Sequence, residues 1–414
     1  MAYGDHPEDE ELRSAWKQFC RNLEGAGDRV FKEHNPATSL HRADGFRFLT
    51  QNLGQAFDLA LETRNTQYPV IHAFCSPFRK LGGDNADYTY QQAWIDGHSQ
   101  YRISGNVGTC RFFNIAVQGA RPVPKPGMRG LHDPFGDTPQ ANLFGHDMVV
   151  GWDGSFEVYI GGEQRGDNWL PTTPDTRKLF IRQGFDDWSE LPVTMRIERV
   201  GMNSPRPMPD AAEMVAAIDW ASTFVSQLMI DWPDWTYEFS EDFDPDGDNS
   251  FATKRRRSDD PVYNPELDKV RGRAITSMRW RLAPDEALIV EWGRNDKFWM
   301  LTNMGTFMNS MDYLYRPVSY SPARTKVDSD GKVRIVVAHS DPGFHNWMDT
   351  QGFEVGHIGA RNNFTSEGTD YRTQVVKFDD LAKVLPGDTV RVTPKERTAM
   401  MLQRYYSILR RYNF

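Results

Sequence analysis

Apolar residues recur every three or four positions in two N-terminal stretches of the chain, which is the spacing of amphipathic helices. Residues 11–31 carry the first pattern, with Trp16 and Phe19 on its apolar side. Residues 44–63 carry the second, with a broader apolar side. Both patterns predict helices, which together would form an N-terminal helical cap over residues 1–66.

From residue 67 onward, the pattern changes to short strand-like runs separated by turn-forming residues. Strands are expected at residues 70–74, 155–160, 178–182 and 192–200. Residues 100–117 predict a hairpin that turns at Gly105-Asn106, and the Pro- and Gly-rich residues 122–140 predict a loop. Residues 67–208 are therefore expected to form a first β-sandwich unit.

Helical spacing returns at residues 209–229, where Asp210 is the expected N-cap. A charged, irregular connector follows, so helix and connector together occupy residues 209–261. Further strands are expected at residues 275–282, 287–292 and 297–302, within residues 333–364, and at residues 374–378. They predict a second β-sandwich unit over residues 262–394, followed by a C-terminal helix over residues 395–414 that is rich in Arg and Tyr.

The two strand-rich regions repeat one another at an offset of about 177 residues, from Asp153 to Asp330. The matching features are Asp153-Gly154 with Asp330-Gly331, Asp167-Asn168-Trp169-Leu170 with His345-Asn346-Trp347-Met348, Arg182 with Arg361, and Gly105 with Gly293. Four matches in the same order indicate a duplicated β unit. The expected fold class is therefore mainly β with helical additions (α+β): two tandem β-sandwich or jelly-roll-like units, an N-terminal helical cap and a C-terminal helix.

Composition narrows the class of protein. The 414 residues carry a net charge of -9, which argues against a general nucleic-acid-binding surface. No run approaches the roughly 18 apolar residues of a membrane helix, and the acidic N-terminus does not resemble a secretory signal. Three scattered cysteines do not suit a disulfide framework. We therefore expect a cytoplasmic protein that binds neither membranes nor nucleic acid.

The stretch from Val333 to Phe364 concentrates the titratable side chains. We expect its histidines and aspartates to be catalytic, namely His345, His357, Asp349, His339 and Asp341, and Arg361 and Trp347 to bind substrate. Imidazole suits acid/base work because its pKa lies near neutrality. The first repeat lacks these histidines, and an architectural role alone would not explain that difference. The alternative is that His and Asp near turns simply satisfy backbone groups.

Two further groupings leave alternatives open. His339, His345 and His357 could bind a metal with a nearby Asp, but their spacing matches no standard signature, so no metal or cofactor is expected. Asp87 and Tyr90 lie in a polar loop entering a strand, and are either substrate-binding residues or part of an Asx-type turn. The calcium-like residues 244–250 and the basic run 254–257 are expected to be solvated loops, and no nucleotide-binding motif is present.

The first strand-rich region resembles the DUF1214 domain family. The family pattern consists of an Asp-Asn-Pro-Asp loop, a Tyr-Arg-x-x-Gly strand, and an Asn-Trp-Leu-Pro turn before a strand that ends in Arg. It falls here on Asp84, Asn85 and Asp87, on Tyr101, Arg102 and Gly105, on Asn168, Trp169, Leu170 and Pro171, and on Arg182, with Ala86 in place of Pro. The resemblance covers residues 68–200 and continues more weakly through Asn346, Trp347 and Arg361. It implies a β-sandwich or jelly-roll, often in tandem, and implies no catalytic residue.

Twelve tryptophans suggest an aromatic-lined cleft. The leading hypothesis is a metal-independent hydrolase or lyase that uses His acid/base catalysis on a small aromatic, terpenoid-like or sugar-like molecule. The alternative is a non-catalytic protein, built from tandem β-sandwiches, that binds a ligand or carbohydrate or serves in assembly. A duplicated unit would also suit a homo-oligomer.

Overall fold

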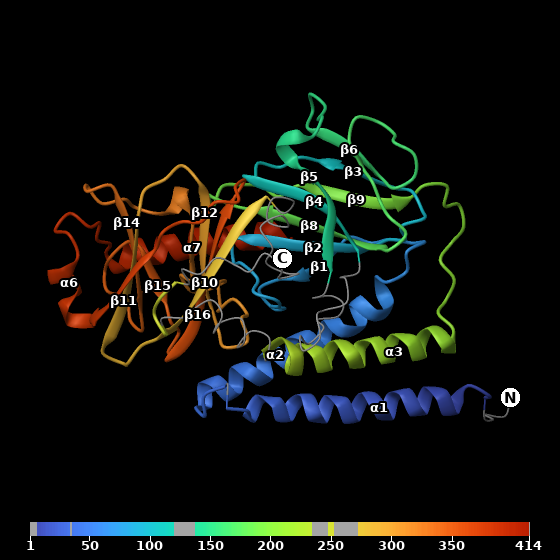
Figure 1. The fold of residues 1–414 in the computed structure, drawn as a ribbon, viewed down its shortest axis with the longest axis horizontal. Helices are drawn as coiled ribbons and strands as arrows, with labels where there is room; N and C mark the ends of the chain where they lie inside the picture. Colours follow the sequence, from blue (N-terminus) through green and yellow to red (C-terminus); the bar gives the residue numbers. More distant parts are fainter. Residues whose placement is uncertain (1–5, 34, 120–136, 234–246, 252–271, 414) are drawn as a thin grey trace.

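Two β-sandwich units lie side by side, and three long helices form a layer against them (Figure 1). The computed structural model describes residues 6–33, 35–119, 137–233, 247–251 and 272–413. This architecture confirms the predicted fold class of mainly β with helical additions. Within the described residues, no helix is long and apolar enough to cross a membrane.

The first unit consists of two sheets. Its strands are β1 (His72–Cys75), β2 (Tyr88–Trp94), β3 (Tyr101–Asn106), β4 (Phe112–Gly119), β5 (Thr138–Phe144), β6 (Ser155–Ile160), β7 (Trp169–Leu170), β8 (Thr176–Gly184) and β9 (Thr194–Arg199). One sheet has the order β1-β2-β8-β4-β5 and the other β7-β6-β3-β9. Between them lies an apolar core of mostly aliphatic side chains, including Ile103, Ile115, Val158 and Ile181.

The second unit repeats this topology. Its strands are β10 (Arg273–Arg281), β11 (Glu286–Gly293), β12 (Phe298–Met304), β13 (Ser319–Tyr320), β14 (Lys332–Ala338), β15 (Trp347–Asp349), β16 (Val355–Asn363) and β17 (Arg372–Lys377). The orders β10-β16-β12-β13 and β15-β14-β11-β17 match β2-β8-β4-β5 and β7-β6-β3-β9 strand for strand. The short strands β7 and β15 both pair in parallel with the preceding long strand. The strand-rich part of the chain is therefore an internal duplication, and β1 is an additional strand of the first copy.

Side-chain hydrogen bonds are also repeated. The amide nitrogen of Asn168 donates to the carbonyls of Val149 and Glu157, and that of Asn346 donates to those of Lys326 and Arg334, each 177 residues further on. The indole nitrogen of Trp169 donates to the carbonyl of Gly161, and that of Trp347 donates to the carbonyl of Ala338. These two carbonyls are again 177 residues apart in the sequence. The Asn-Trp pair is therefore a structural device of the fold, because it ties the short parallel strand to its neighbour in both copies.

The predicted hairpin over residues 100–117 is wrong. Strand β3 pairs with β6 and β9, whereas β4 pairs with β5 and β8 in the other sheet. Gly105 is an interior residue of β3, where an added Cβ would lie 2.2 Å from the carbonyl oxygen of Thr194. Glycine is needed there for close strand packing, not for a turn.

Other predicted segments lie partly outside the described residues. Of the expected loop over residues 122–140, residues 138–140 begin strand β5, and residues 122–136 are not described. The basic run 254–257 is likewise not described. Of the calcium-like residues 244–250, only residues 247–250 are described, and there Asp248 pairs with Arg279 and Arg281. That carboxylate is therefore held by two guanidinium groups.

The helical layer contains α1 (Asp9–Asp28), α2 (Ser39–Phe57) and α3 (Ala211–Ser226). Asp210 caps α3 as predicted, in a capping box with Glu213. The apolar core under this layer includes Phe48 and Phe224 from the helices, Phe74 from the first unit and Met300 from the second. The helices thus pack against both units and hold them together.

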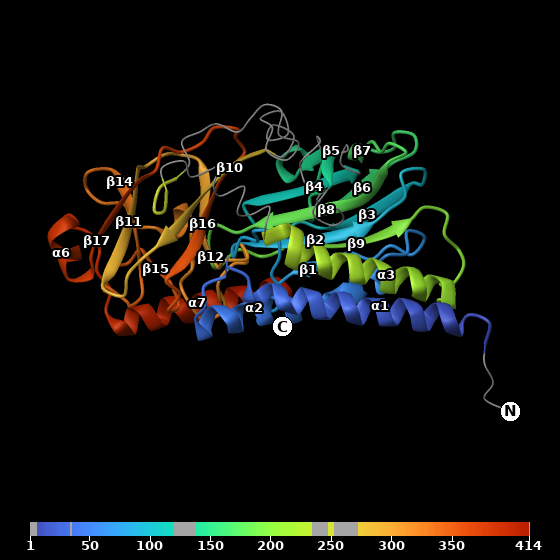
Figure 2. The ribbon, with the colours of Figure 1, turned by 60° about the horizontal axis from the view of Figure 1, so that its bottom comes forward.

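Two helices follow β17: α6 (Leu381–Val384) and α7 (Pro394–Tyr412). Helix α7 begins with a capping box between Thr393 and Glu396. It runs along the second unit toward the first (Figure 2), where Arg410 donates a hydrogen bond to the carbonyl of Trp188. Helix α7 is therefore a second connection between the units.

Candidate functional site

Three buried arginines lie on one face of α7. Arg397, Arg404 and Arg411 are spaced seven residues apart, which places them on the same side of a helix. Arg404 donates to the carbonyl of Tyr313 at 2.6 Å and to the hydroxyl of Ser319 at 2.8 Å. Because a buried guanidinium is costly without partners, this face binds helix α7 to the body through its polar groups.

Asp87 is the carboxylate that faces two of these guanidinium groups, those of Arg404 and Arg411, together with that of Arg324. It is 0 % exposed, and its Oδ2 lies 2.5 Å from Arg324 Nη2 while its Oδ1 lies 3.8 Å from Arg411 Nη1. Burial by itself would raise the pKa of Asp87, but Arg324, Arg404 and Arg411 bring it below its usual value. Burial lowers the pKa of Arg404 and of Arg411 to about 10, so both remain charged at neutral pH.

A cavity of about 160 Å³ lies beside this group, where the first unit, the second unit and α7 meet. We call it the junction cavity. Its lining residues are Asp187, Trp188, Pro317, Ser319, Tyr320, Ala323, Arg324, Lys326, His345, Met400, Met401, Gln403 and Arg404. The guanidinium of Arg324 lies 4.1 Å from the ring centroid of Trp188, and that of Arg404 lies 5.1 Å from it. The cavity therefore combines cationic groups with aromatic and thioether surface.

Of the predicted catalytic residues, His345 is the one that lines this cavity. Its Nδ1 lies 3.0 Å from Oδ1 of Asn346, and that oxygen also accepts from the backbone N–H of Lys326. Since the Asn346 nitrogen donates to two carbonyls, its oxygen is an acceptor and His345 Nδ1 must carry the proton. The neutral ring then has a bare Nε2. Burial lowers the pKa of His345 below its ordinary value, which favours this neutral form.

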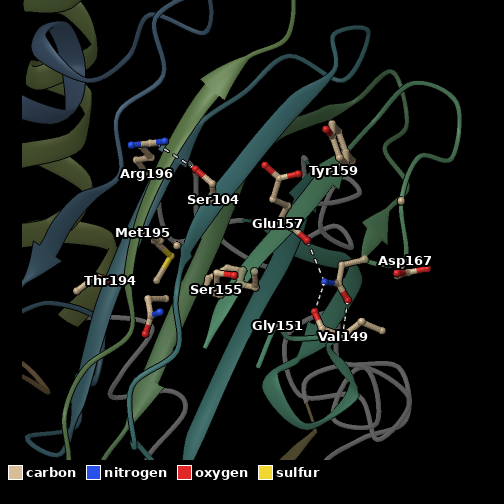
Figure 3. Close-up of a pocket in the computed structure, with 15 residues that line it drawn as sticks. Ser104, Val149, Gly151, Ser155, Glu157, Tyr159, Asp167, Thr194, Met195 and Arg196 are labelled. Carbon is tan, nitrogen blue, oxygen red and sulfur yellow. Dashed lines mark hydrogen bonds between the residues drawn. The ribbon is translucent and has the colours of Figure 1, made fainter. Parts of the chain in front are cut away.

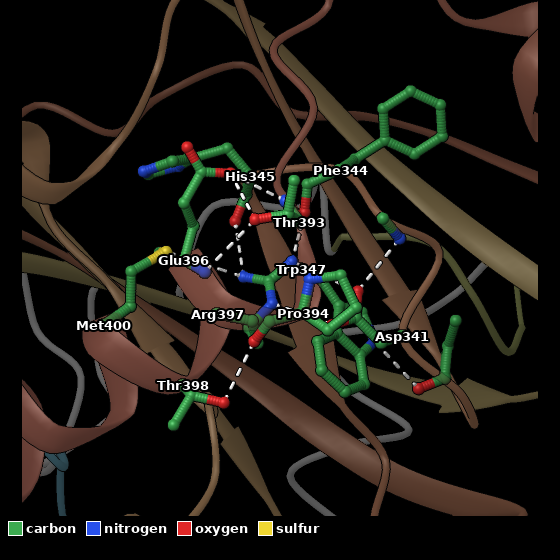
Figure 4. A network of polar contacts seen from close by, with 12 residues as sticks. Asp341, Phe344, His345, Trp347, Thr393, Pro394, Glu396, Arg397, Thr398 and Met400 are labelled. Atoms are coloured by element: carbon green, nitrogen blue, oxygen red, sulfur yellow. Dashed lines mark hydrogen bonds and ion pairs between the residues drawn. The ribbon is translucent and has the colours of Figure 1, made fainter.

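Arg397 holds the backbone around His345 (Figure 4). It donates to both oxygens of Asp341, at 2.9 and 3.2 Å, and to the carbonyls of His345 and Phe344. Tyr320 donates its hydroxyl to the same His345 carbonyl at 2.7 Å. Asp341, predicted to be catalytic, is thus the partner of a positioning arginine and does not line the cavity.

The other predicted catalytic residues lie elsewhere. His339 is half-buried at a turn, where it contacts the hydroxyl of Thr350 and the carbonyl of Ala283. His357 is buried on β16, and burial lowers its pKa to about 4. Asp349 is buried and paired with Arg316. The three predicted catalytic histidines therefore do not lie in one site.

This scatter also bears on the metal alternative. Within the described ranges, no three His, Cys, Asp or Glu side chains are grouped as metal ligands would be. Trp347, predicted to bind substrate, is buried and serves the structural role that it shares with Trp169.

The polar loop before β2 is buried at the boundary between the units. Asp84 accepts from the backbone N–H and the hydroxyl of Ser310, and the hydroxyl of Tyr90 accepts from the N–H of Asn85. Arg361 donates to the carbonyl of Gly83. Asp87 and Arg361 thus make buried contacts between the units, with Arg324 and Gly83 respectively, whereas Tyr90 holds the loop from within the first unit. Asp87 does not line the junction cavity but faces two arginines that do, Arg324 and Arg404.

A wider hollow of about 860 Å³ lies on the outer face of sheet β7-β6-β3-β9 (Figure 3). Its polar side chains are largely paired with one another: Arg196 donates to Ser104, and Arg102 bridges Glu157 and Glu198. In the second unit, the strand registers place Ile289 and Val336 where Arg102 and Tyr159 stand.

That second face is covered. Ile289 and Val336 pack against Leu381 and Leu385, in and just after α6. The face of the first unit is open and carries polar residues, whereas the matching face of the second unit is covered and carries apolar residues, as solvation alone requires. The polar residues of the hollow therefore do not by themselves indicate a binding site. We accordingly place the candidate site in the junction cavity.

Most of the charged residues that line the cavity could not be identified from the sequence. Arg324 and Lys326, like the aromatic residue Trp188, lie in short irregular segments that carry no motif. The seven-residue spacing of Arg397, Arg404 and Arg411 was a usable signal, because three arginines on one face of a helix indicate that this face meets polar groups.

Comparisons with known proteins agree with this fold and add no chemistry. Residues 86–183 match the family described as "Protein of unknown function (DUF1214)". A solved structure of a putative uncharacterized protein from Burkholderia cenocepacia is 26% identical with a TM-score of 0.77, covering 90% of this chain and 99% of that one. The solved structure of the VPA0106 protein from Vibrio parahaemolyticus is 12% identical with a TM-score of 0.43, and the match covers 86% of this chain and 100% of that one. No curated protein matches the chain.

Proposed function

We propose that the chain binds a compact organic anion in the junction cavity. The DUF1214 family that residues 86–183 match has a description that carries no activity, so the proposal comes from the chain's own geometry. The observation that carries this proposal is the lining: Arg324, Lys326 and Arg404 approach one small space. Cationic side chains gathered in a partly dry cavity favour an anionic ligand, because their field is screened less there than in water.

Asp187 is the one carboxylate in this lining, and it offsets only part of the charge of the three cationic side chains. Asp187 accepts from the N–H of Ser189 at 2.8 Å and from its hydroxyl at 2.6 Å, so its Oδ1 is engaged in its own turn. Much of the remaining lining is aromatic or apolar, including Trp188, Tyr320 and Met400. These surfaces suit the organic part of a ligand whose charged group lies near the arginines.

Calorimetric titration of the purified chain tests this proposal. We expect acetate, benzoate, sulfate or phosphate to bind more tightly than the neutral analogues acetamide and benzamide. Lys326→Gln should weaken anion binding about two- to fivefold, the effect of one exposed charge. Lys395→Gln, the same change at an exposed position outside the cavity, is the matched control. Binding that does not distinguish anions from neutral analogues would reject the proposal.

A second candidate function is acid/base turnover of the bound anion by a hydrolase or lyase, and the bare Nε2 of His345 favours it. A neutral imidazole fixed through Nδ1 can accept a proton from a water or a substrate carbon within reach. The ligand would then be a small aromatic or sugar-like acid.

Substitution of His345 separates the two functions. His345→Gln should retain anion binding within a fewfold but abolish any hydrolysis or elimination found in a panel of small esters and hydroxy acids. The wild-type rate should fall as the pH drops through the lowered pKa of His345. Unchanged turnover in His345→Gln would remove the histidine from the chemistry, and binding without turnover across the panel would favour the non-catalytic function.

A further inference from the structure

The buried charges around the junction cavity do not balance. Three guanidinium groups, those of Arg324, Arg404 and Arg411, face the single carboxylate of Asp87. Among the neighbouring acids, Asp186 pairs with Arg111. Glu190 accepts from the backbone N–H groups of Asp186 and Arg111 and offsets part of the charge of Arg411. With Lys326 included, four cationic groups are matched by the three carboxylates of Asp87, Glu190 and Asp187, so the site keeps a net positive charge.

Excess charge of this kind is expensive in a buried site. Arg404 and Arg411 are 1 % and 6 % exposed, and each ion taken out of water without compensation costs several kcal/mol. The three guanidinium nitrogens of Arg411 make no hydrogen bond to any described residue. Resting on the proposed function, we infer that the ligand of the junction cavity carries a phosphoryl group and is a small phosphate monoester.

The donors that remain available suit a phosphoryl group. The bonds of Arg404 to Tyr313 and Ser319 use its Nε and Nη2, which leaves Nη1 without a partner among the described residues. The ammonium of Lys326 likewise has no ion pair within the described part of the chain. Arginine and lysine together are the usual ligands of phosphate oxygens, the first through a planar fork and the second as a point charge.

His345 completes the set of groups around such a ligand. Its Nε2 can accept the proton of a singly ionised phosphate, or take up a proton from solvent and donate it to a dianion. Either state puts a third polar group beside the phosphoryl oxygens, next to Arg404 and Lys326.

The size of the cavity limits the rest of the ligand. Its volume of about 160 Å³ lies well below the roughly 300–1,000 Å³ of sites that take drug-sized ligands. A nucleotide is too large, whereas a phosphate on a few carbon atoms fits. Pro317, Tyr320 and Met400 offer the surface against which those carbons would pack.

Titration of the purified full chain at pH 7.5 tests the inference. The probes are inorganic phosphate, glycerol phosphate, sulfate, acetate, benzoate and malonate. We expect phosphate and glycerol phosphate to bind at least tenfold more tightly than acetate and benzoate. Their affinity should fall between pH 7 and 5 relative to that of sulfate, because the second phosphate pKa is about 6 and sulfate keeps its charge. Lys326→Gln should weaken phosphate binding severalfold, and Lys395→Gln should not.

The outcomes separate the two claims. If acetate or benzoate binds as tightly as the phosphates, or if malonate binds best, the phosphate inference is overturned while anion binding stands. If no anion binds better than acetamide, both fail. Phosphate binding that is unchanged in Lys326→Gln would place the ligand outside the junction cavity and would also overturn the inference.

Discussion

Replacing Asp87 by Asn should lower the free energy of unfolding by about 3 to 5 kcal/mol, because three buried guanidinium groups would lose their shared carboxylate. The Asp87 oxygens lie 2.5 Å from Arg324 Nη2 and 3.8 Å from Arg411 Nη1. At an effective dielectric constant of about 20, opposite charges about 4 Å apart attract by roughly 4 kcal/mol. The relief of carboxylate desolvation offsets part of that loss.

The assay is urea unfolding at pH 7, followed by tryptophan fluorescence. Asp187→Asn is the matched control, because this neighbouring carboxylate is part-exposed and bonds Ser189, so its loss should cost only about 1 kcal/mol. A cost for Asp87→Asn no greater than for Asp187→Asn would refute the idea that the junction depends on this carboxylate.

The pH dependence supplies a second test of the same substitution. The folded-state pKa of Asp87 lies below its ordinary value, so its stabilisation is present above the unfolded-state pKa of about 3.9. It is lost as the pH falls through the lower folded-state pKa. The difference in stability between wild type and Asp87→Asn should therefore be constant from pH 5 to 7 and shrink below about pH 4. A difference that grows on acidification would contradict this sign.

Four other substitutions test the remaining structural claims. Arg397→Met should cost about 2 to 3 kcal/mol in urea unfolding and weaken anion binding, because His345 loses its backbone anchor; unchanged affinity would show that the anchor is not needed. Burial lowers the pKa of His357 to about 4, so wild type should lose roughly 3 kcal/mol between pH 6.5 and 4, as the unfolded chain takes up a proton that the folded one does not. His357→Asn can keep the donor to the Gly305 carbonyl and should lose that much less over the same interval. Trp169→Phe and Trp347→Phe each remove one indole donor to a strand carbonyl, and calorimetric unfolding should give similar costs of about 1 to 2 kcal/mol; a large difference would argue against equivalent roles.

The duplication was predictable because the two copies share short sequence motifs. Asn168-Trp169 and Asn346-Trp347 form the same bonds in each copy, so the repeated letters reflect a repeated physical requirement. The single strands and the long helices followed from periodicity for the same reason. The pairing of β3 with β6 and β9 could not be predicted in this way. A glycine such as Gly105 can indicate either a turn or a close contact with a neighbouring strand, and the two cannot be distinguished until that strand is known.

The candidate site was only partly predictable. His345 was identified because it stands where the first copy has Asp167, a departure from the repeat that can be read from the letters alone. His339 and His357 were grouped with it because they are close in sequence, yet alternation along β16 and the turn after β14 point them to different places.

By itself, the sequence determined the tandem β architecture, its helical additions and the difference in chemistry between the copies at His345, since hydrophobic period and repeated motifs act over a few residues. The tertiary structure alone decided which charges meet. Arg324, Arg404 and Asp87 come from segments more than seventy residues apart, and they face one another only because α7 lies across the boundary of the two sandwiches. Charge interactions of that kind depend on distance and burial, and neither is recorded in the order of the residues.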